Sequence, residues 1–325
     1  MTRLIEERTT SMFRAAASQV TTSRWDLSEE LPILSAHGFE ALSVWRHKFS
    51  DIGLDSTRRL LDRAGIRASS VQWAGGFTGG DGRTFDESVA DAQEAIDLAG
   101  GLGAPVLVLH SGCRGGHTRS HAQRLLVQAL EILSPQATEA GVSLAIKPLH
   151  PSVAAGCGFL TRLDEALGIV DDLIDRDPVH ACIGLTIDLW HFGDDPDLGS
   201  LLPLLADRTS LVQVADRNGP PTSEQERLPV GRGILPLQET VEAFLDQGYR
   251  GDFEFDPVGA AVEAEGYERV LADLRSTADA WSRSLRADGG HEDWPADGPR
   301  RLAHPPRPAA GNRRSQASSQ TASPG

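Results

Sequence analysis

The chain has 325 residues, a formal charge of −15 and 40% hydrophobic residues. That apolar content is enough for a core and excludes global disorder. The acidity excludes a protein that works by neutralising nucleic-acid phosphates or by binding anionic membranes. The sequence contains no run of about 18 apolar residues, so no transmembrane helix is predicted. The N-terminus lacks the apolar region of a signal peptide. Three scattered cysteines, Cys113, Cys157 and Cys182, favour a reducing, cytoplasmic compartment.

Short apolar runs alternate with amphipathic stretches along the chain. Strands are expected at residues 17–23, 39–45, 66–73, 105–111, 143–149, 183–189, 210–216 and 251–256. Helices are expected after Trp25, capped by Asp26 or Ser28, and at residues 56–65, 85–103, 120–141, 161–173, 200–207, 235–248 and 263–283. Glycines at the helix–strand junctions, such as Gly65 and Gly103, match the usual helix C-cap.

Eight strands alternating with eight helices predict a (β/α)8 TIM barrel, with a doubly wound open sheet as the alternative. The glycine-rich segment 75–80 lacks the spacing of a dinucleotide-binding loop and therefore gives the open sheet no support. We expect an N-terminal segment at residues 1–16 and the barrel at residues 17–283. Residues 284–325 are rich in Pro, Gly, Ser and Arg, and this composition predicts a disordered tail.

In a TIM barrel the active site lies at the C-terminal ends of the strands. The expected strands end in, or are followed by, these polar, ionisable or aromatic residues: Trp45, Gln72, Trp73, His110, Lys147, His150, Asp188, His191, Gln213, Asp216 and Asp256. Some have structural alternatives: His110 as a buried histidine bonded to a carbonyl, Asp216 as a loop cap, and the tryptophans as rim packing. Asp188 ends an apolar strand, where a carboxylate needs a partner or a metal ion.

The segments that contain these residues resemble a known family. Residues 43–77, 103–112, 140–151, 186–198 and 228–256 resemble the sugar phosphate isomerase/epimerase group of xylose isomerase-like TIM barrels. That group includes tagatose 3-epimerase, hydroxypyruvate isomerase and inosose dehydratase. The resemblance implies a divalent metal ion held by Glu, Asp, His and Glu at the ends of strands five to eight, with the two Glu residues transferring protons.

Part of the family's site is retained. Asp188 and His191 match its D-x-x-H pair, in which the Asp binds the metal and the His contacts the substrate. Arg227 precedes a variant of the family's P-G-x-G turn, where an Arg often binds a substrate oxygen. With the strand-end residues, this gives the candidate substrate-binding set: His150, Arg227, Trp45, Gln72, His110 and Gln213.

The remaining metal ligands are replaced. Lys147 takes the position of the first Glu, Gln213 that of the His, and Asp256, a shorter carboxylate, that of the second Glu. An ammonium group has no lone pair for a metal, so only Asp188 and Asp256 remain as metal ligands. We expect the Mn, Mg, Co or Zn ion to be absent or weakly bound, with Lys147 in its place, paired with Asp188 and Asp256. Glu254 is expected deeper in the barrel.

These replacements leave two functions open. In the first, the protein isomerises, epimerises or dehydrates a ketose, polyol or related hydroxy-carbonyl compound. Lys147 then polarises the carbonyl, Asp256 transfers the proton, and His191 and Arg227 orient the substrate. In the second, the barrel is inactive and binds a small polyhydroxy ligand. DNA repair, which the wider superfamily includes, is disfavoured because the ligands of a trinuclear zinc site are missing. The resemblance is compatible with a homo-oligomer.

Overall fold

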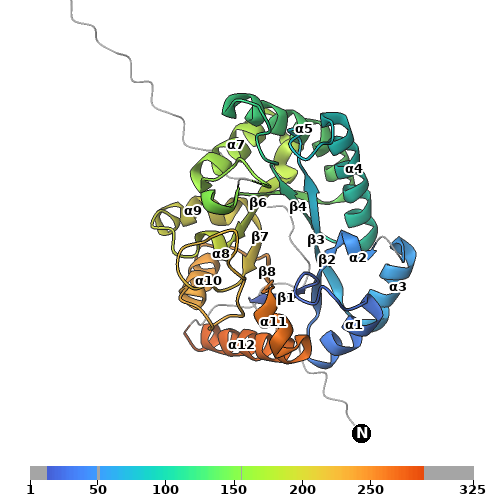
Figure 1. Ribbon diagram of the computed structural model, residues 1–325, viewed down its shortest axis with the longest axis vertical. Helices are drawn as coiled ribbons and strands as arrows, with labels where there is room; N and C mark the ends of the chain where they lie inside the picture. Colours follow the sequence, from blue (N-terminus) through green and yellow to red (C-terminus); the bar gives the residue numbers. More distant parts are fainter. Residues whose placement is uncertain (1–12, 50–51, 155, 289–325) are drawn as a thin grey trace, which may run out of the picture. The chain divides into compact units, whose positions relative to one another are not determined.

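Eight parallel strands form a closed barrel in the computed structural model, which describes residues 13–49, 52–154 and 156–288 (Figure 1). Each strand pairs with the next, and the last pairs with the first. The strands are β1 (Arg14–Ser18), β2 (Ala41–Trp45), β3 (Arg67–Gly75), β4 (Val106–His110), β5 (Ser143–Lys147), β6 (Ile183–Asp188), β7 (Thr209–Val214) and β8 (Asp252–Phe255). This confirms the predicted (β/α)8 barrel and excludes the open sheet.

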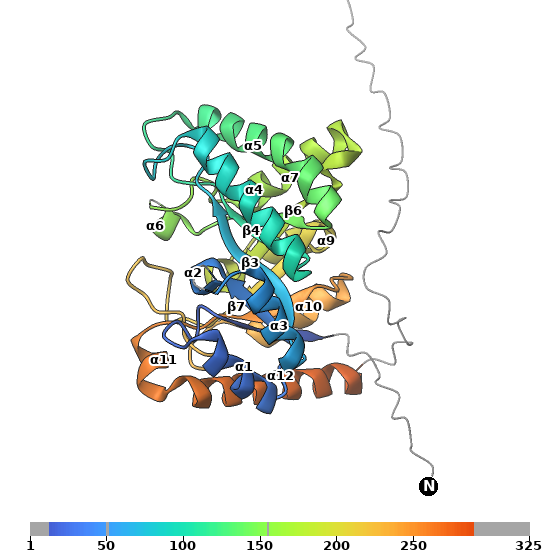
Figure 2. The same ribbon diagram turned by 90° about the vertical axis from the view of Figure 1, so that its right-hand side faces the viewer.

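Long helices surround the barrel, as expected from the alternating pattern. They are α1 (Leu27–Ala36), α3 (Leu54–Ala64), α4 (Phe85–Leu102), α5 (Arg119–Ala140), α7 (Leu163–Arg176), α9 (Leu198–Arg208), α10 (Leu237–Asp246) and α12 (Tyr267–Asp288). Short helices that the sequence did not predict are α2 (Arg46–Phe49), α6 (Pro151–Ala154), α8 (Leu189–Phe192), α11 (Ala260–Glu265) and a 3₁₀ turn at Pro178–Cys182. Figure 2 shows α2, α6 and α11 at one end of the barrel, where the strands end.

The helix ends follow the sequence signals closely. Asp26, not Ser28, is the N-cap of α1, and it exchanges hydrogen bonds with Glu29 in a capping box. Gly65 and Gly103 end α3 and α4 in the left-handed conformation, at φ values of 68°. A side chain would be strained at that φ, so glycine is the natural residue at both positions.

The first strand lies earlier than expected. It covers Arg14–Ser18 rather than residues 17–23, and Thr21 belongs to a turn. The β-branched residues of 17–23 suggested a strand, but the register with β8 joins Arg14–Ala17 to Asp252–Phe255, so tertiary pairing overrides local strand propensity. At the other end, α12 continues to Asp288, so residues 284–288 are helical rather than part of a tail. The rest of the expected tail and residues 1–12 lie outside the described residues.

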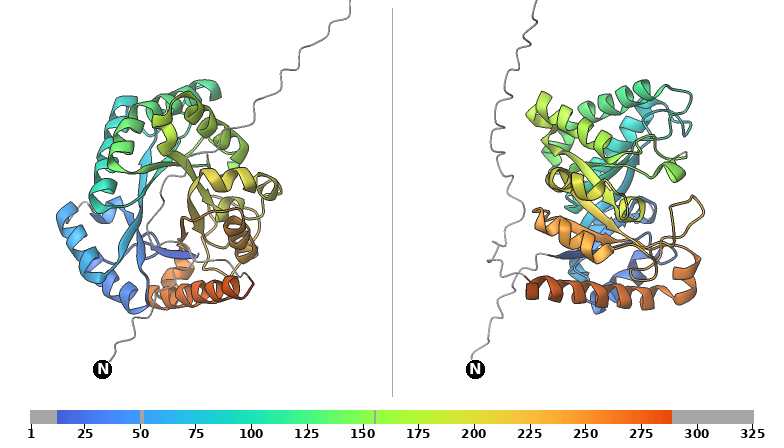
Figure 3. Two further views of the ribbon diagram at one scale, coloured as in Figure 1. Left: turned by 180° about the vertical axis from the view of Figure 1, so that it is seen from behind. Right: turned by 90° about the vertical axis from the view of Figure 1, so that its left-hand side faces the viewer.

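The main core lies between the strands and the surrounding helices. Figure 3 shows α12 running along the outside of the barrel, where Trp281 packs against Phe13 and Phe255 at the β1–β8 seam. A small separate apolar cluster that includes Val108, from β4, and Leu211, from β7, fills part of the barrel interior. In the part of the chain that the structure describes, no helix is long and apolar enough to cross a membrane.

Candidate active site

Four candidate residues lie at the ends of consecutive strands. Lys147 is the last residue of β5, Asp188 is the last residue of β6, Gln213 lies in β7, and Asp256 follows β8 directly. The strand register places Asp188 beside Gln213 and Gln213 beside Glu254. Because alternate side chains of a strand point to the same face, these residues point into the barrel together.

Asp188 is fully buried and contacts two cationic side chains. The Nζ atom of Lys147 lies 2.7 Å from its Oδ2 atom, and the two terminal nitrogens of Arg227 donate to its two oxygens, each at 3.0 Å. The backbone N–H of Trp190 donates to Oδ1 at 3.0 Å. Burial opposes the charge on Asp188, but Arg227 and Lys147 outweigh it and hold its pKa well below the ordinary value. Asp188 is therefore a stable anion whose partners come from the protein itself.

Asp256 is held by Arg227 rather than by Lys147. The Nη2 atom of Arg227 donates to Asp256 Oδ1 at 2.6 Å, and its Nε atom donates to the Asp256 backbone oxygen at 3.2 Å. Of the expected pairs of Lys147 with both aspartates, the structure shows only the one with Asp188. Asp256 pairs with Arg227 instead, which bridges the two aspartates. Burial raises the pKa of Asp256 to about 6, with Arg227 opposing the shift and Asp188 adding to it. A carboxyl group with this pKa can accept and release a proton near neutral pH.

Glu254 forms a second layer below Asp256, as expected. Its carboxylate accepts hydrogen bonds from Ser70 Oγ at 2.8 Å, Gln72 Nε2 at 2.6 Å and Gln213 Nε2 at 3.0 Å. Burial, together with the charge of Asp256, raises the pKa of Glu254 to about 7. Gln72 and Gln213 are thus fixed with their amide nitrogens toward Glu254. Ser70 has no distinctive sequence signal beyond its alternate position two residues before Gln72.

The histidines at the mouth are neutral. Burial lowers the pKa of His191 and of His110 to about 3, with the Asp188 charge opposing and the Lys147 charge assisting in each case. His191 Nδ1 faces the backbone N–H of His150 at 3.4 Å, and its Nε2 lies 3.6 Å from Asp188 Oδ2. His110 shows no bond from Nδ1 to a carbonyl within the described residues. Both rings can therefore hydrogen-bond a neutral substrate group without carrying charge.

Asp216 organises the loop that carries Arg227. It accepts backbone hydrogen bonds from Gly231 at 3.1 Å, Gly233 at 2.9 Å and Leu235 at 3.1 Å, so its structural alternative as a loop cap is the one observed. Its own backbone exchanges two hydrogen bonds of 2.8 Å with Leu228, the residue after Arg227. Sequence reasoning did not predict that Asp216 positions Arg227. The available signal was a buried carboxylate followed by a glycine-rich turn.

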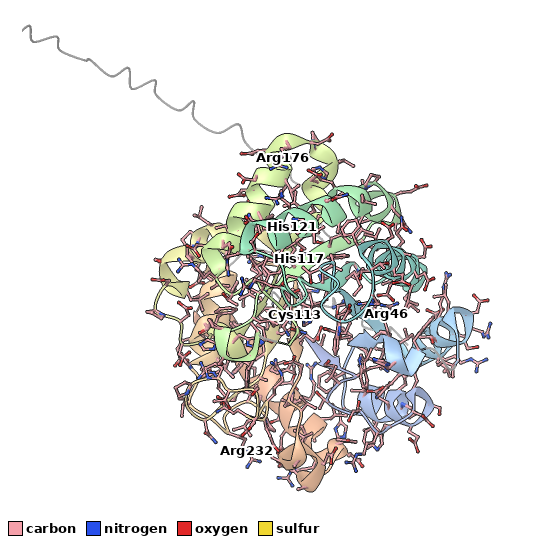
Figure 4. The ribbon with its side chains drawn as sticks, turned by 45° about the horizontal axis from the view of Figure 1, so that its top comes forward. Arg46, Cys113, His117, His121, Arg176 and Arg232 are labelled. Atoms are coloured by element: carbon pink, nitrogen blue, oxygen red, sulfur yellow. The ribbon has the colours of Figure 1, made fainter. Side chains whose placement is uncertain are left out.

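A cavity of about 930 Å³ opens over the ends of β2, β3 and β4. Trp45, Gln72, Trp73 and His110 line it, and Figure 4 shows two further lining residues, Arg46 of α2 and Cys113 of the loop after β4. Gln72 and His110 connect the cavity to the charged centre, because Gln72 bonds Glu254 and His110 pairs in register with Lys147. The expected site residues thus fall into two adjacent parts, a charged centre at β5–β8 and an open cavity at β2–β4.

A family model for the xylose isomerase-like TIM barrel matches residues 31–279. The chain belongs to this family. No curated protein sequence matches the chain. The sequence resemblance to this group is therefore confirmed at the level of the family.

Several solved structures share this fold. A protein from Sinorhizobium meliloti 1021 is 24% identical with a TM-score of 0.73, and the match covers 83% of this chain and 98% of that one. The IOLI protein, solved with a zinc atom, is 17% identical with a TM-score of 0.68, covering 85% and 99%. D-Psicose 3-epimerase from Clostridium cellulolyticum H10, solved with D-tagatose, is 14% identical with a TM-score of 0.66, covering 84% and 99%. At these identities the likeness shows the fold alone.

The donor set at the charged centre does not fit the divalent ion of the xylose isomerase-like family. The Lys147 ammonium lies 2.7 Å and the Arg227 guanidinium 3.0 Å from Asp188 Oδ2, the oxygen that would have to bind the ion, and both positive charges would repel a divalent ion there. Gln213 turns its amide nitrogen, not its oxygen, toward Glu254. Among the described ranges, no group of three or more His, Cys, Asp or Glu side chains converges as metal ligands do.

Proposed function

We propose that this barrel is an enzyme that isomerises, epimerises or dehydrates a polyhydroxy carbonyl compound, with Lys147 in the position of the family's metal ion. The observation that carries the proposal is the buried Lys147–Asp188 pair at the strand ends, beside an open cavity. A cation at the mouth of the barrel supplies the charge that a carbonyl oxygen needs when it becomes an enolate.

In this mechanism the substrate carbonyl oxygen accepts a hydrogen bond from Lys147. Asp256 removes a proton from the neighbouring carbon, and the electron pair of the broken C–H bond moves to form a carbon–carbon double bond as the carbonyl oxygen becomes negative. Return of the proton to the former carbonyl carbon, with the hydroxyl proton of the deprotonated carbon passing to the former carbonyl oxygen, gives isomerisation. Delivery of the proton to the opposite face of the deprotonated carbon gives epimerisation. Expulsion of a hydroxyl group from the next carbon gives dehydration. His191 and Arg227 orient the hydroxyl groups of the substrate.

A specific observation supports a second candidate, an inactive barrel that binds a polyhydroxy ligand. Both oxygens of Asp188 are engaged by Arg227, and Arg227 also holds Asp256. Such a cluster can serve as a structural ion-pair network in which no proton moves. The enzyme is favoured here because Asp256 has a pKa near neutrality and belongs to the charged centre, which Gln72 and His110 connect to the cavity.

Deuterium exchange distinguishes the two candidates. The wild-type protein, freed of metal with a chelator, is incubated in D₂O with a panel of ketoses, inososes and their phosphates, and exchange next to the carbonyl is followed by proton NMR. An enzyme exchanges at least one member of the panel, and Lys147→Met and Asp256→Asn each reduce the rate by about 100-fold or more. The exposed Asp207→Asn variant, on α9, retains the wild-type rate. Binding without exchange supports the inactive barrel.

A further inference from the structure

The cavity over β2–β4 has a large volume and lies beside the charged centre, where the reacting group of the substrate is proposed to bind. Its volume of about 930 Å³ lies near the upper end of the range of roughly 300–1,000 Å³ that is typical of small-molecule sites. The reacting carbonyl, by the function proposed above, lies at Lys147 and Asp256, on the β5–β8 side. Gln72 and His110 are the lining residues that connect the two parts. A substrate that reacts at the centre can therefore extend into the cavity with a part that does not react.

One residue of the cavity wall is an exposed aromatic side chain. Trp73, in β3, is 42% exposed, which is unusual for a large apolar side chain in this protein. One side of its ring packs against His110, with centroids 5.4 Å apart, and Arg46 Nη1 donates to its backbone oxygen at 3.2 Å. The ring is thus held in place while much of its surface remains open to the cavity. A fixed, hydrated indole ring is a surface on which another ring can stack.

Both arginines of the cavity wall already have carboxylate partners. Arg46 forms a two-pronged pair with Asp91 at 2.7 and 3.0 Å, and Arg83 pairs with Asp81 at 2.7 Å and with Asp91 at 3.1 Å. With Glu94 also in the wall, the two arginines face three carboxylates, which leaves one net negative charge. A phosphate group there would meet net repulsion and would have to break an existing pair. An uncharged group meets neither cost.

We propose that this cavity holds an uncharged ring that the substrate carries in addition to its polyhydroxy carbonyl part, stacked on Trp73. The substrate class is therefore a glycoside or aryl-substituted polyol rather than a sugar phosphate. This inference rests on the proposed function for the position of the reacting end. The ring contact itself depends only on the cavity and on Trp73.

The experiment measures binding by isothermal titration calorimetry. The ligands are methyl and phenyl glycosides of glucose, galactose and xylose, together with glucose 6-phosphate and xylose 5-phosphate. The wild type is expected to bind at least one phenyl glycoside about tenfold more tightly than its methyl counterpart. Trp73→Ala reduces that ratio to about twofold or less, and Trp73→Phe restores most of it. The control is Leu204→Ala, on α9, which removes another exposed apolar side chain (59% exposed) outside the cavity wall and leaves the ratio unchanged.

Several results would overturn the ring site. They are equal affinity for methyl and phenyl glycosides, tighter binding of a phosphate than of every neutral ligand, an unchanged preference in Trp73→Ala, or no binding by any ligand in the panel. The proposed function is tested separately by deuterium exchange. A preserved phenyl preference without exchange of any carbonyl compound contradicts the function and leaves the ring site supported. Exchange of a sugar phosphate, without a phenyl preference, does the reverse.

Discussion

Arg227 donates from its two terminal nitrogens to both carboxylate oxygens of Asp188, each at 3.0 Å, although the residues come from separate elements. This two-pronged geometry is the strong form of an ion pair. Lys147 pairs with the same carboxylate, so the buried Asp188 side chain faces two cations. The stability of the centre is therefore expected to depend on Asp188.

Asp188→Asn is expected to lower the free energy of unfolding by about 3–5 kcal/mol, because it leaves Lys147 and Arg227 buried next to each other with less opposite charge. Urea denaturation at pH 7 measures the change. The exposed Asp207→Asn variant, which breaks a surface pair with Arg208, should cost about 1 kcal/mol or less. A loss at Asp188 as small as that at Asp207 would show that the cluster contributes little to stability.

Metal binding is expected to respond to Lys147. Purified wild-type protein should contain less than one equivalent of divalent metal, measured by elemental analysis after dialysis. Lys147→Glu removes the repelling charge and restores the family's carboxylate, so it should bind Mn²⁺ at least about tenfold more tightly, followed by electron paramagnetic resonance. Arg232→Glu adds the same charge at an exposed position and should leave Mn²⁺ affinity at the wild-type level. One stoichiometric ion in the wild type, lost in Asp188→Ala, would contradict this prediction.

The stability of the Arg227 loop is expected to depend on Asp216. Asp216→Ala leaves several backbone N–H groups of the loop without their charged acceptor, and should lower the free energy of unfolding by about 3 kcal/mol. Asp216→Asn keeps one acceptor oxygen and should cost about half as much. Asp195→Ala, which removes a single hydrogen bond to an exposed N–H, serves as the control in the same denaturation series.

The fold could be predicted because its signals are local and repeated. The cap at Asp26 and the glycines at Gly65 and Gly103 end helices by backbone rules that need no tertiary contact. The first strand was misplaced because its position is decided by pairing with β8, at the far end of the barrel's sequence. Alanines have weak strand propensity, so nothing local pointed to residues 14–16.

The residues that lie together at the strand ends could also be predicted, but the ion pairs that they form could not. Strand ends converge in any TIM barrel, so Lys147, Asp188 and Asp256 were expected to lie together. Which cation faces which carboxylate depends on a long loop, and Arg227 reaches Asp188 from a loop that Asp216 and Val258 hold in place. The catalytic and substrate-binding roles of these residues stay predictions.

The pH dependence of stability is expected to report on Glu254. Its pKa is raised to about 7, so between about pH 4.5 and 7 the folded state keeps a proton that the unfolded chain has released, and stability falls as the pH rises. Glu254→Gln cannot titrate. The free energy of unfolding of the variant minus that of the wild type should therefore rise by about 3 kcal/mol across this range and then level off. The exposed Glu139→Gln variant is the control, and a difference that is flat with pH would contradict the prediction.

Two glycine substitutions should have opposite signs. Gly75 has a φ of 125°, and a Cβ atom there would lie 2.1 Å from the backbone oxygen of His110, so Gly75→Ala should cost at least about 2 kcal/mol and disturb the cavity wall. Gly168 lies in α7 with nothing within 4 Å of an added Cβ atom. Gly168→Ala should add roughly 0.5–1 kcal/mol, because alanine is the better helix former. Thermal denaturation of both variants checks the signs, and stabilisation by Gly75→Ala would contradict the expected clash with His110.

The β1–β8 seam has a consequence for folding kinetics. Because the second neighbour of the first strand is the last strand, closure of the barrel joins residues at the far ends of the folded sequence. Such non-local pairing slows folding, and it leaves two open sheet edges in any chain that has not yet acquired β8. During synthesis, the ring can close only after the final strand has emerged, so the Asp256 half of the charged centre is completed last.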